Sequence, residues 1–82
     1  MLLDASRLTD KIASFTYLKS VLRPEDLIGN NLDALYDYLT SIGDTSISLI
    51  NCTEAGEYGV KIIRVMDDAE KDNPYLHIFR VE

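Results

Sequence analysis

Two aspartates four residues apart, Asp33 and Asp37, are the most informative pair of charged side chains in this chain. On a helix, residues at this spacing are neighbours on one face, and two like charges there disfavour the helix by a few tenths of a kcal/mol. Such a pair can be a solvated face, a binding surface for a cationic partner, or an acid–base pair. Solubility is the commonest use of exposed aspartates, and acid–base catalysis would need a cleft that shifts one carboxyl pKa.

The remaining reactive side chains do not form a catalytic or metal-binding pattern. His77 is the single histidine, and its apolar neighbours predict a partly buried packing residue. Cys52 is the single cysteine, and we expect a small buried apolar residue there. Gly56 and Gly59 are isolated in an acidic context and make no phosphate-binding loop. We therefore expect no catalytic residue, no metal and no cofactor, and hence no enzyme.

The charge of the chain is strongly uneven. The whole chain of 82 residues carries a net charge of −6, with a pI near 4.5. Between Arg23 and Lys61 there are seven acids and no Lys or Arg, so this window carries −7 and the rest +1. This balance argues against binding to a nucleic acid or to an anionic membrane, because a protein that binds either one needs a basic surface. It favours a basic protein partner.

Length and composition indicate one domain over residues 1–82. A single cysteine excludes an intrachain disulfide, which favours a reducing, cytoplasmic environment. The longest apolar run is far shorter than the roughly 20 residues that a membrane span needs. The opening Met-Leu-Leu-Asp has no basic region before an apolar stretch, so we expect no signal peptide. We expect the free protein to be a monomer.

Periodic apolar residues predict three helices between three strands. The helices are expected at 10–22 with Thr9 or Asp10 as the cap, from Asn30 or Asn31 to about Thr40, and from about Thr53 to Asp72. Their apolar stripes are Ile12, Phe15, Leu18 and Leu22; Leu32, Leu35, Tyr36 and Leu39; and Gly59, Ile62, Ile63, Met66 and Ala69. Strands are expected at 1–3, 45–51 and 75–81. A strand–helix–strand order with a helix of this length implies parallel pairing, and thus a small α/β domain.

The segment from Gly29 to Thr40, with Pro24 before it, resembles the hallmark helix of the barstar family of intracellular ribonuclease inhibitors. The resemblance is in the run Asn31-Leu32-Asp33-Ala34-Leu35-Tyr36-Asp37. It implies a two-layer fold with about three helices on a three-stranded parallel sheet of order 1-2-3, whose central strand is the one at 45–51. It also implies a stoichiometric inhibitor of a barnase-type, guanyl-type microbial ribonuclease.

The same resemblance implies which residues meet the ribonuclease. The acidic helix would occlude the active site, with Asp37 as the central carboxylate and Asp33 as a second one in place of RNA phosphates. The implied contact residues are Leu27, Gly29, Asn31, Asp33, Tyr36, Asp37, Thr40, Ser41, Ile42 and Asp68. The turn from Glu25 to Ile28 is one residue longer than the family's and contains no tyrosine. A non-enzymatic α/β binding or immunity module for another basic toxin or partner therefore remains the alternative.

Overall fold

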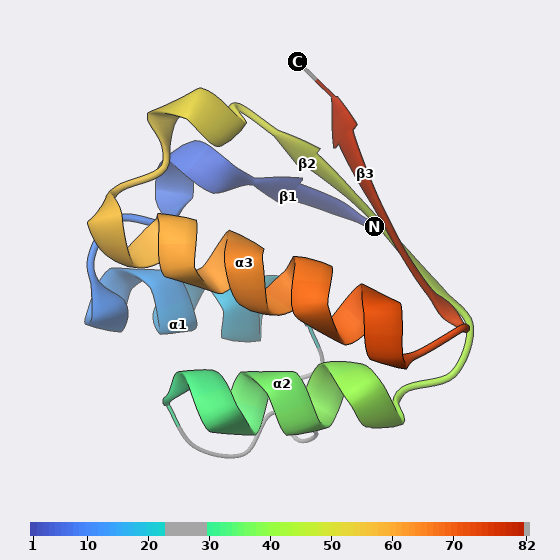
Figure 1. Ribbon diagram of the computed structural model, residues 1–82. Coiled ribbons are helices and arrows are strands. Elements are labelled where there is room, and N and C mark those ends of the chain that lie inside the picture. Colours follow the sequence, from blue (N-terminus) through green and yellow to red (C-terminus); the bar gives the residue numbers. More distant parts are fainter. Residues whose placement is uncertain (23–29, 82) are drawn as a thin grey trace.

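The structure is a computed structural model that describes residues 1–22 and 30–81. In the described chain, helices connect the strands of one sheet (Figure 1). The elements are β1 (Leu2–Asp4), η1 (Ala5–Arg7), α1 (Lys11–Val21), α2 (Leu32–Ser41), β2 (Thr45–Ile50), η2 (Cys52–Glu54), α3 (Glu57–Asp72) and β3 (Leu76–Val81), where η marks a short 3-10 turn. None of these helices is long and apolar enough to cross a bilayer.

The sheet has the order β1-β2-β3, and both strand pairs are parallel. Leu3 is opposite Leu49, and Ile47 is opposite Ile78. Helical segments follow β1 and β2 and return the chain to the same end of the sheet, as parallel pairing requires. The expected α/β class, the strand order and the central position of the strand at residues 45–50 are confirmed.

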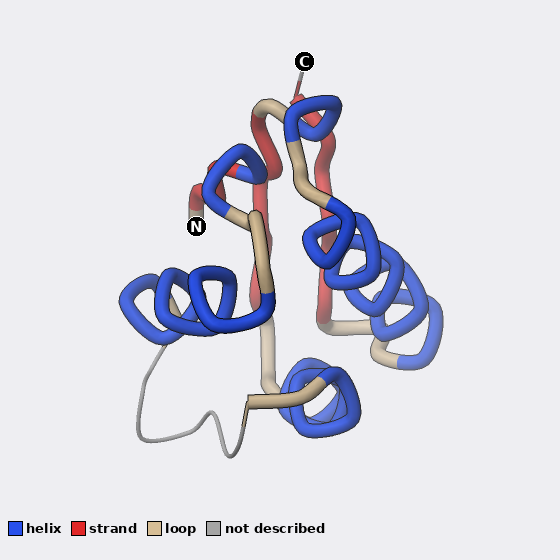
Figure 2. The backbone as a smooth tube through the Cα atoms, turned by 90° about the vertical axis from the view of Figure 1, so that its left-hand side faces the viewer, coloured by secondary structure: helices blue, strands red, loops and turns tan. Residues whose placement is uncertain are grey.

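The helices all lie on one side of the sheet (Figures 1 and 2). Strand residues that face them are buried, among them Leu3, Ile47, Leu49 and Leu76. Helix α3 covers the sheet with its predicted stripe, since Gly59, Ile62, Ile63, Met66 and Ala69 are all buried. Helix α2 lies beyond the amino ends of β2 and β3 and packs mainly against α3.

The opposite face of the sheet is exposed, which corrects the prediction for His77. This histidine is exposed and its ring stacks on Phe79, 6.5 Å between centroids, instead of packing in the interior. Val81 and Leu2 are exposed on the same face. Side chains of a strand alternate between faces, and here only the face toward the helices is covered.

Helix α1 begins as predicted at Asp10, whose carboxylate accepts a hydrogen bond from the Ala13 amide at 2.8 Å. Its predicted stripe is wrong at Ile12, which is 80% exposed. The buried face of α1 includes Ser14 beside Phe15, and this rotates Ile12 toward water.

Helix α3 begins at Glu57, four residues later than predicted. Asn51 adopts a left-handed conformation with φ 56°, and the 3-10 turn η2 follows it directly. The amide of Gly56 then donates to the Leu8 carbonyl at 2.9 Å. The chain is thereby held against η1 before α3 can start.

A close approach of backbones explains Gly59, which is otherwise a poor residue for a helix. A Cβ atom at this position would lie 2.2 Å from the carbonyl oxygen of Leu8. The glycine therefore allows α3 to approach the segment after η1, where Leu8 is completely buried.

The buried side chain of Asn73 fastens the end of α2 to the end of α3. Asn73 is 4% exposed, and its amide group donates to the carbonyls of Leu39 at 2.9 Å and Ile42 at 3.0 Å. Its side-chain oxygen accepts from the Tyr75 amide at 3.0 Å. One amide thus satisfies carbonyls at the C-terminus of α2 and also fixes the turn into β3.

Replacing Gly59 with alanine is expected to lower the free energy of unfolding by about 1–3 kcal/mol, because the new methyl group overlaps Leu8. Urea unfolding measures this change. Gly43→Ala is the matched control, since nothing lies within 4 Å of a Cβ at Gly43. Equal stability of the two variants would contradict the close approach.

Replacing Asn73 with alanine is expected to cost about 2–4 kcal/mol, because two carbonyls lose their donor in a buried place. Asn73→Asp has the same shape but cannot donate when ionised, so we expect it to be at least as destabilising at neutral pH. Urea unfolding of both variants checks the prediction. An aspartate variant as stable as the parent would show that donation to α2 is not what matters.

Candidate functional site

Helix α2 begins where its capping residue predicts. The side-chain oxygen of Asn31 accepts a hydrogen bond from the Ala34 amide at 2.8 Å, and Asn31 itself has an extended backbone. This satisfies one of the free amides at the start of the helix. The side chain of Asn31 is therefore held at the N-terminus of α2, where the predicted contact surface begins. Leu27 and Gly29 lie outside the described residues.

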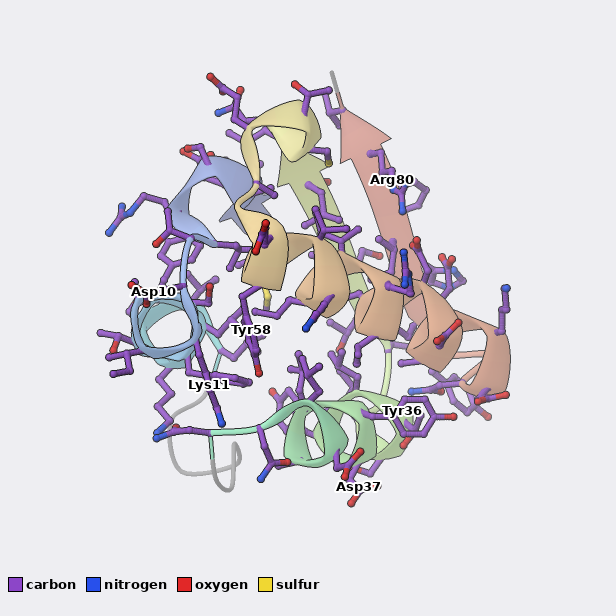
Figure 3. The ribbon with its side chains drawn as sticks, turned by 60° about the vertical axis from the view of Figure 1, so that its left-hand side comes forward. Asp10, Lys11, Tyr36, Asp37, Tyr58 and Arg80 are labelled. Atoms are coloured by element: carbon purple, nitrogen blue, oxygen red, sulfur yellow. The ribbon has the colours of Figure 1, made fainter. Side chains whose placement is uncertain are left out.

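The helix separates an apolar face from an acidic one. Leu35 and Leu39 are completely buried against the core, whereas Asp33 and Asp37 are exposed. Figure 3 shows Asp37 on the outer side of α2. Tyr36 is half-buried at the border between the two faces, as the helical periodicity predicts.

Tyr36 also joins α2 to α3. Its hydroxyl donates a hydrogen bond to Oδ2 of Asp72, in the last turn of α3. This bond raises the pKa of the Tyr36 phenol above its ordinary value, and partial burial and the charges of Asp72, Asp68 and Asp37 raise it further. The phenol therefore stays a proton donor throughout the neutral pH range.

The charges of Asp37, Asp68 and Asp72 all act on this tyrosine. Asp33 lies one turn before Asp37 on the same helix. Asp68 and Asp72 are exposed and four residues apart on α3, so they repeat the spacing of the pair on α2. Together the four side chains form an acidic surface that spans both helices, here called the acidic seam: Asp33, Asp37, Asp68 and Asp72.

Asp72 is the member of the seam that sequence reasoning missed. The sequence shows that Asp72 lies four residues after Asp68. However, the acidic run from Asp67 to Asp72 is also typical of the solvent-exposed face of a helix. The distinguishing fact is the contact with Tyr36, which arises because α2 packs against α3.

No ion pair among the described residues involves an aspartate of the seam. Within residues 1–22 and 30–81, the one ion pair joins Arg80 to Asp67, outside the seam. Asp72 also opposes the α3 dipole, because a carboxylate is unfavourable at a helix C-terminus. In that part of the chain no three His, Cys, Asp or Glu side chains are placed to hold a metal ion. The seam can therefore attract cations of a partner.

The polar residues after Tyr36 are held by their own helix. Thr40 Oγ1 donates to the Tyr36 carbonyl at 2.9 Å, and Ser41 Oγ donates to the Tyr38 carbonyl at 3.0 Å. Ile42 ends α2 and is half-buried. An open groove of about 890 Å³ begins beside Ser41 and Ile42. Thr40, Ser41 and Ile42 thus form the surface at the C-terminal end of α2, next to the acidic seam. The hydrogen bonds to the helix backbone hold the two hydroxyl groups in place.

The other reactive side chains stay apart from the seam. His77 lies on the exposed sheet face and Cys52 is half-buried in η2. The Asp4 carboxyl has a pKa below its usual range, because Ser6 and Asn51 donate hydrogen bonds to it. That carboxylate fastens the carboxyl end of β1 to the residue after β2, which is a structural task.

Comparison with protein families gives one match that spans essentially the whole chain. Residues 1–81 match the family model described as Barstar (barnase inhibitor). A search of curated proteins finds no match. The matched range includes both helices of the acidic seam.

Proposed function

The chain belongs to the barstar family, and we propose that it is a stoichiometric protein inhibitor of a barnase-type ribonuclease. Members of this family are inhibitors of ribonucleases rather than enzymes. The observation that supports the proposal most directly is the acidic seam, in which aspartates from two helices lie near a tyrosine and form no ion pair with any described residue.

The proposed mechanism is occlusion of the ribonuclease active site by α2. A ribonuclease binds RNA phosphates with cationic side chains, and carboxylates on a rigid helix can occupy the same places. We assign the central place to Asp37 and a second one to Asp33, with Tyr36 as the aromatic contact and Asn31 as the cap that holds the helix start. Leu27, Gly29, Thr40, Ser41 and Ile42 would contact the enzyme on either side, and Asp68 would contact it at the periphery.

We propose that the protein acts in the cytoplasm as an antitoxin or immunity protein. Cys52 is the single cysteine of the sequence, so no disulfide can form within the chain, which fits a reducing compartment. An inhibitor there would protect the cell's own RNA from a ribonuclease that is destined for export or arrives from outside. The proposed partner is basic, because binding to the seam requires positive charge.

The alternative is an acidic module of the same fold that binds a different basic toxin or partner. One feature of the sequence favours it: the turn from Glu25 to Ile28 lacks the tyrosine of the family pattern. An enzymatic role for Asp33 and Asp37 has less support, because both carboxylates are exposed to solvent on one helix instead of facing a cleft.

Titration of guanyl-type microbial ribonucleases with the protein distinguishes these functions. We expect at least one enzyme of the panel to lose activity linearly and completely at one equivalent of inhibitor. A general polyanion effect is controlled by an unrelated acidic protein of similar charge. If no ribonuclease is inhibited while a different basic protein binds in a pull-down, the alternative is correct.

Asp37→Ala is expected to weaken inhibition by at least ~3 kcal/mol, more than a hundredfold in Kd, because a buried cation of the enzyme would lose its partner. Folding should be unchanged or slightly improved, since alanine is the better helix former and repulsion from Asp33 is relieved. Inhibition titrations and thermal melts measure the two effects. Glu54→Ala, an exposed acid in η2, is the control for lost charge. A destabilised Asp37 variant that still inhibits fully would make Asp37 structural.

The association rate with the ribonuclease is expected to fall steeply as salt rises, whereas the dissociation rate changes less. The reason is that long-range attraction to the −7 window acts before contact and is screened by ions. Stopped-flow mixing at several ionic strengths measures both rates. An association rate that is flat with salt would remove electrostatic steering from the mechanism.

A further inference from the structure

We propose that Asp72 is a positioning residue, which holds the Tyr36 ring in place and fixes the rotation of α2, so that the acidic face is presented to the ribonuclease. The proposal rests on the proposed function and adds to it a residue that works within the free inhibitor. Asp72 thereby acts through Tyr36 instead of through a cation of the enzyme.

The first observation is the geometry of the contact. Tyr36 starts from the middle of α2, its ring is half-buried, and its hydroxyl reaches Oδ2 of Asp72 on α3. A tyrosine ring has only two side-chain torsions, so a hydrogen bond at its far end restricts both. The ring is then pre-arranged beside Asp37 before any partner arrives, which lowers the entropy cost of binding.

The second observation is that Asp72 and Asn73 hold α2 at two separate places. Asn73 binds the carbonyls of Leu39 and Ile42 at the helix end, while Asp72 binds Tyr36 near its middle. The buried Leu35 and Leu39 decide which face of α2 is turned inward, but leucine packing tolerates small rotations about the helix axis. The second attachment opposes such a turn, and this keeps Asp37 directed outward.

The third observation is that the position of Asp72 is costly for the helix that contains it. A carboxylate in the last turn opposes the helix dipole, and Asp68 is a like charge one turn away. The hydrogen bond to Asp72 and the charges of Asp72, Asp68 and Asp37 raise the pKa of the Tyr36 phenol. The hydroxyl therefore remains a donor, and Asp72 accepts from it.

Four variants test the proposal by inhibition titration: Asp72→Asn, Asp72→Ala, Tyr36→Phe and the double variant Asp72→Ala/Tyr36→Phe. Asp72→Asn keeps an acceptor oxygen and should inhibit within about threefold of the parent. Asp72→Ala and Tyr36→Phe should each weaken inhibition by about tenfold, through the same lost hydrogen bond. The double variant should be no weaker than the weaker single variant. Glu54→Gln controls for the loss of one charge.

A titration of the free protein tests the contact without any enzyme. The chain has five tyrosines, so the absorbance of the Tyr36 phenolate is obtained by subtracting the Tyr36→Phe titration from that of the parent. The pKa of this phenol should fall toward the ordinary value in Asp72→Ala. An unchanged pKa would overturn the proposal, because the contact would be absent in solution.

Two further outcomes distinguish a failure of the positioning role from a failure of the proposed function. If Asp72→Asn loses as much inhibition as Asp72→Ala, and the double variant shows additive losses, Asp72 meets the enzyme directly and the positioning role is wrong. If the parent protein inhibits no ribonuclease, the proposed function fails, and the phenol titration still decides whether Asp72 holds Tyr36.

Discussion

The geometry of the acidic surface depends on the buried amide of Asn73. Helix α2 packs mainly on α3 instead of on the sheet, so something must fix where along α3 it stops. Leucine packing is tolerant of small shifts, whereas a buried amide with its donors and acceptor satisfied is specific in distance and direction. Through the carbonyls of Leu39 and Ile42, Asn73 fixes where along α3 the C-terminal end of α2 lies.

The charges on α2 and α3 are arranged against stability and in favour of recognition. Both helices place two aspartates four residues apart, and one of these acids opposes a helix dipole. The opposing stabilisation comes from the shared core under the two helices, where Leu35, Leu39 and Met66 are completely buried. A local violation of the usual rules with no local compensation is typical of a functional surface. A cationic partner of the kind proposed would relieve this repulsion.

The four acids in the C-terminal half of α3 have different surroundings, which depend on the side of the helix where each one lies. Asp72 accepts from Tyr36 of α2, the charge of Asp68 acts on the same tyrosine, and Asp67 pairs with Arg80 of β3. Glu70 accepts a hydrogen bond from the Ile78 amide at 2.6 Å. That amide points away from β2 on the outer strand, where an unpaired group would invite another chain. Glu70 thus protects one edge of a sheet whose second face is already exposed.

The sequence by itself determined the parts of this protein that depend on neighbours along the chain. Capping side chains and apolar periods located α1, α2 and the core stripe of α3, and the strand–helix–strand order predicted parallel pairing. The resemblance in the run from Asn31 to Asp37 indicated the family that the match over residues 1–81 confirms. The predicted contact residues remain a proposal. Only the tertiary structure decided that Ile12 and His77 face water and that Asp72 meets Tyr36. Periodicity reports that a residue lies on one face of an element, but whether that face is covered depends on which distant element packs against it.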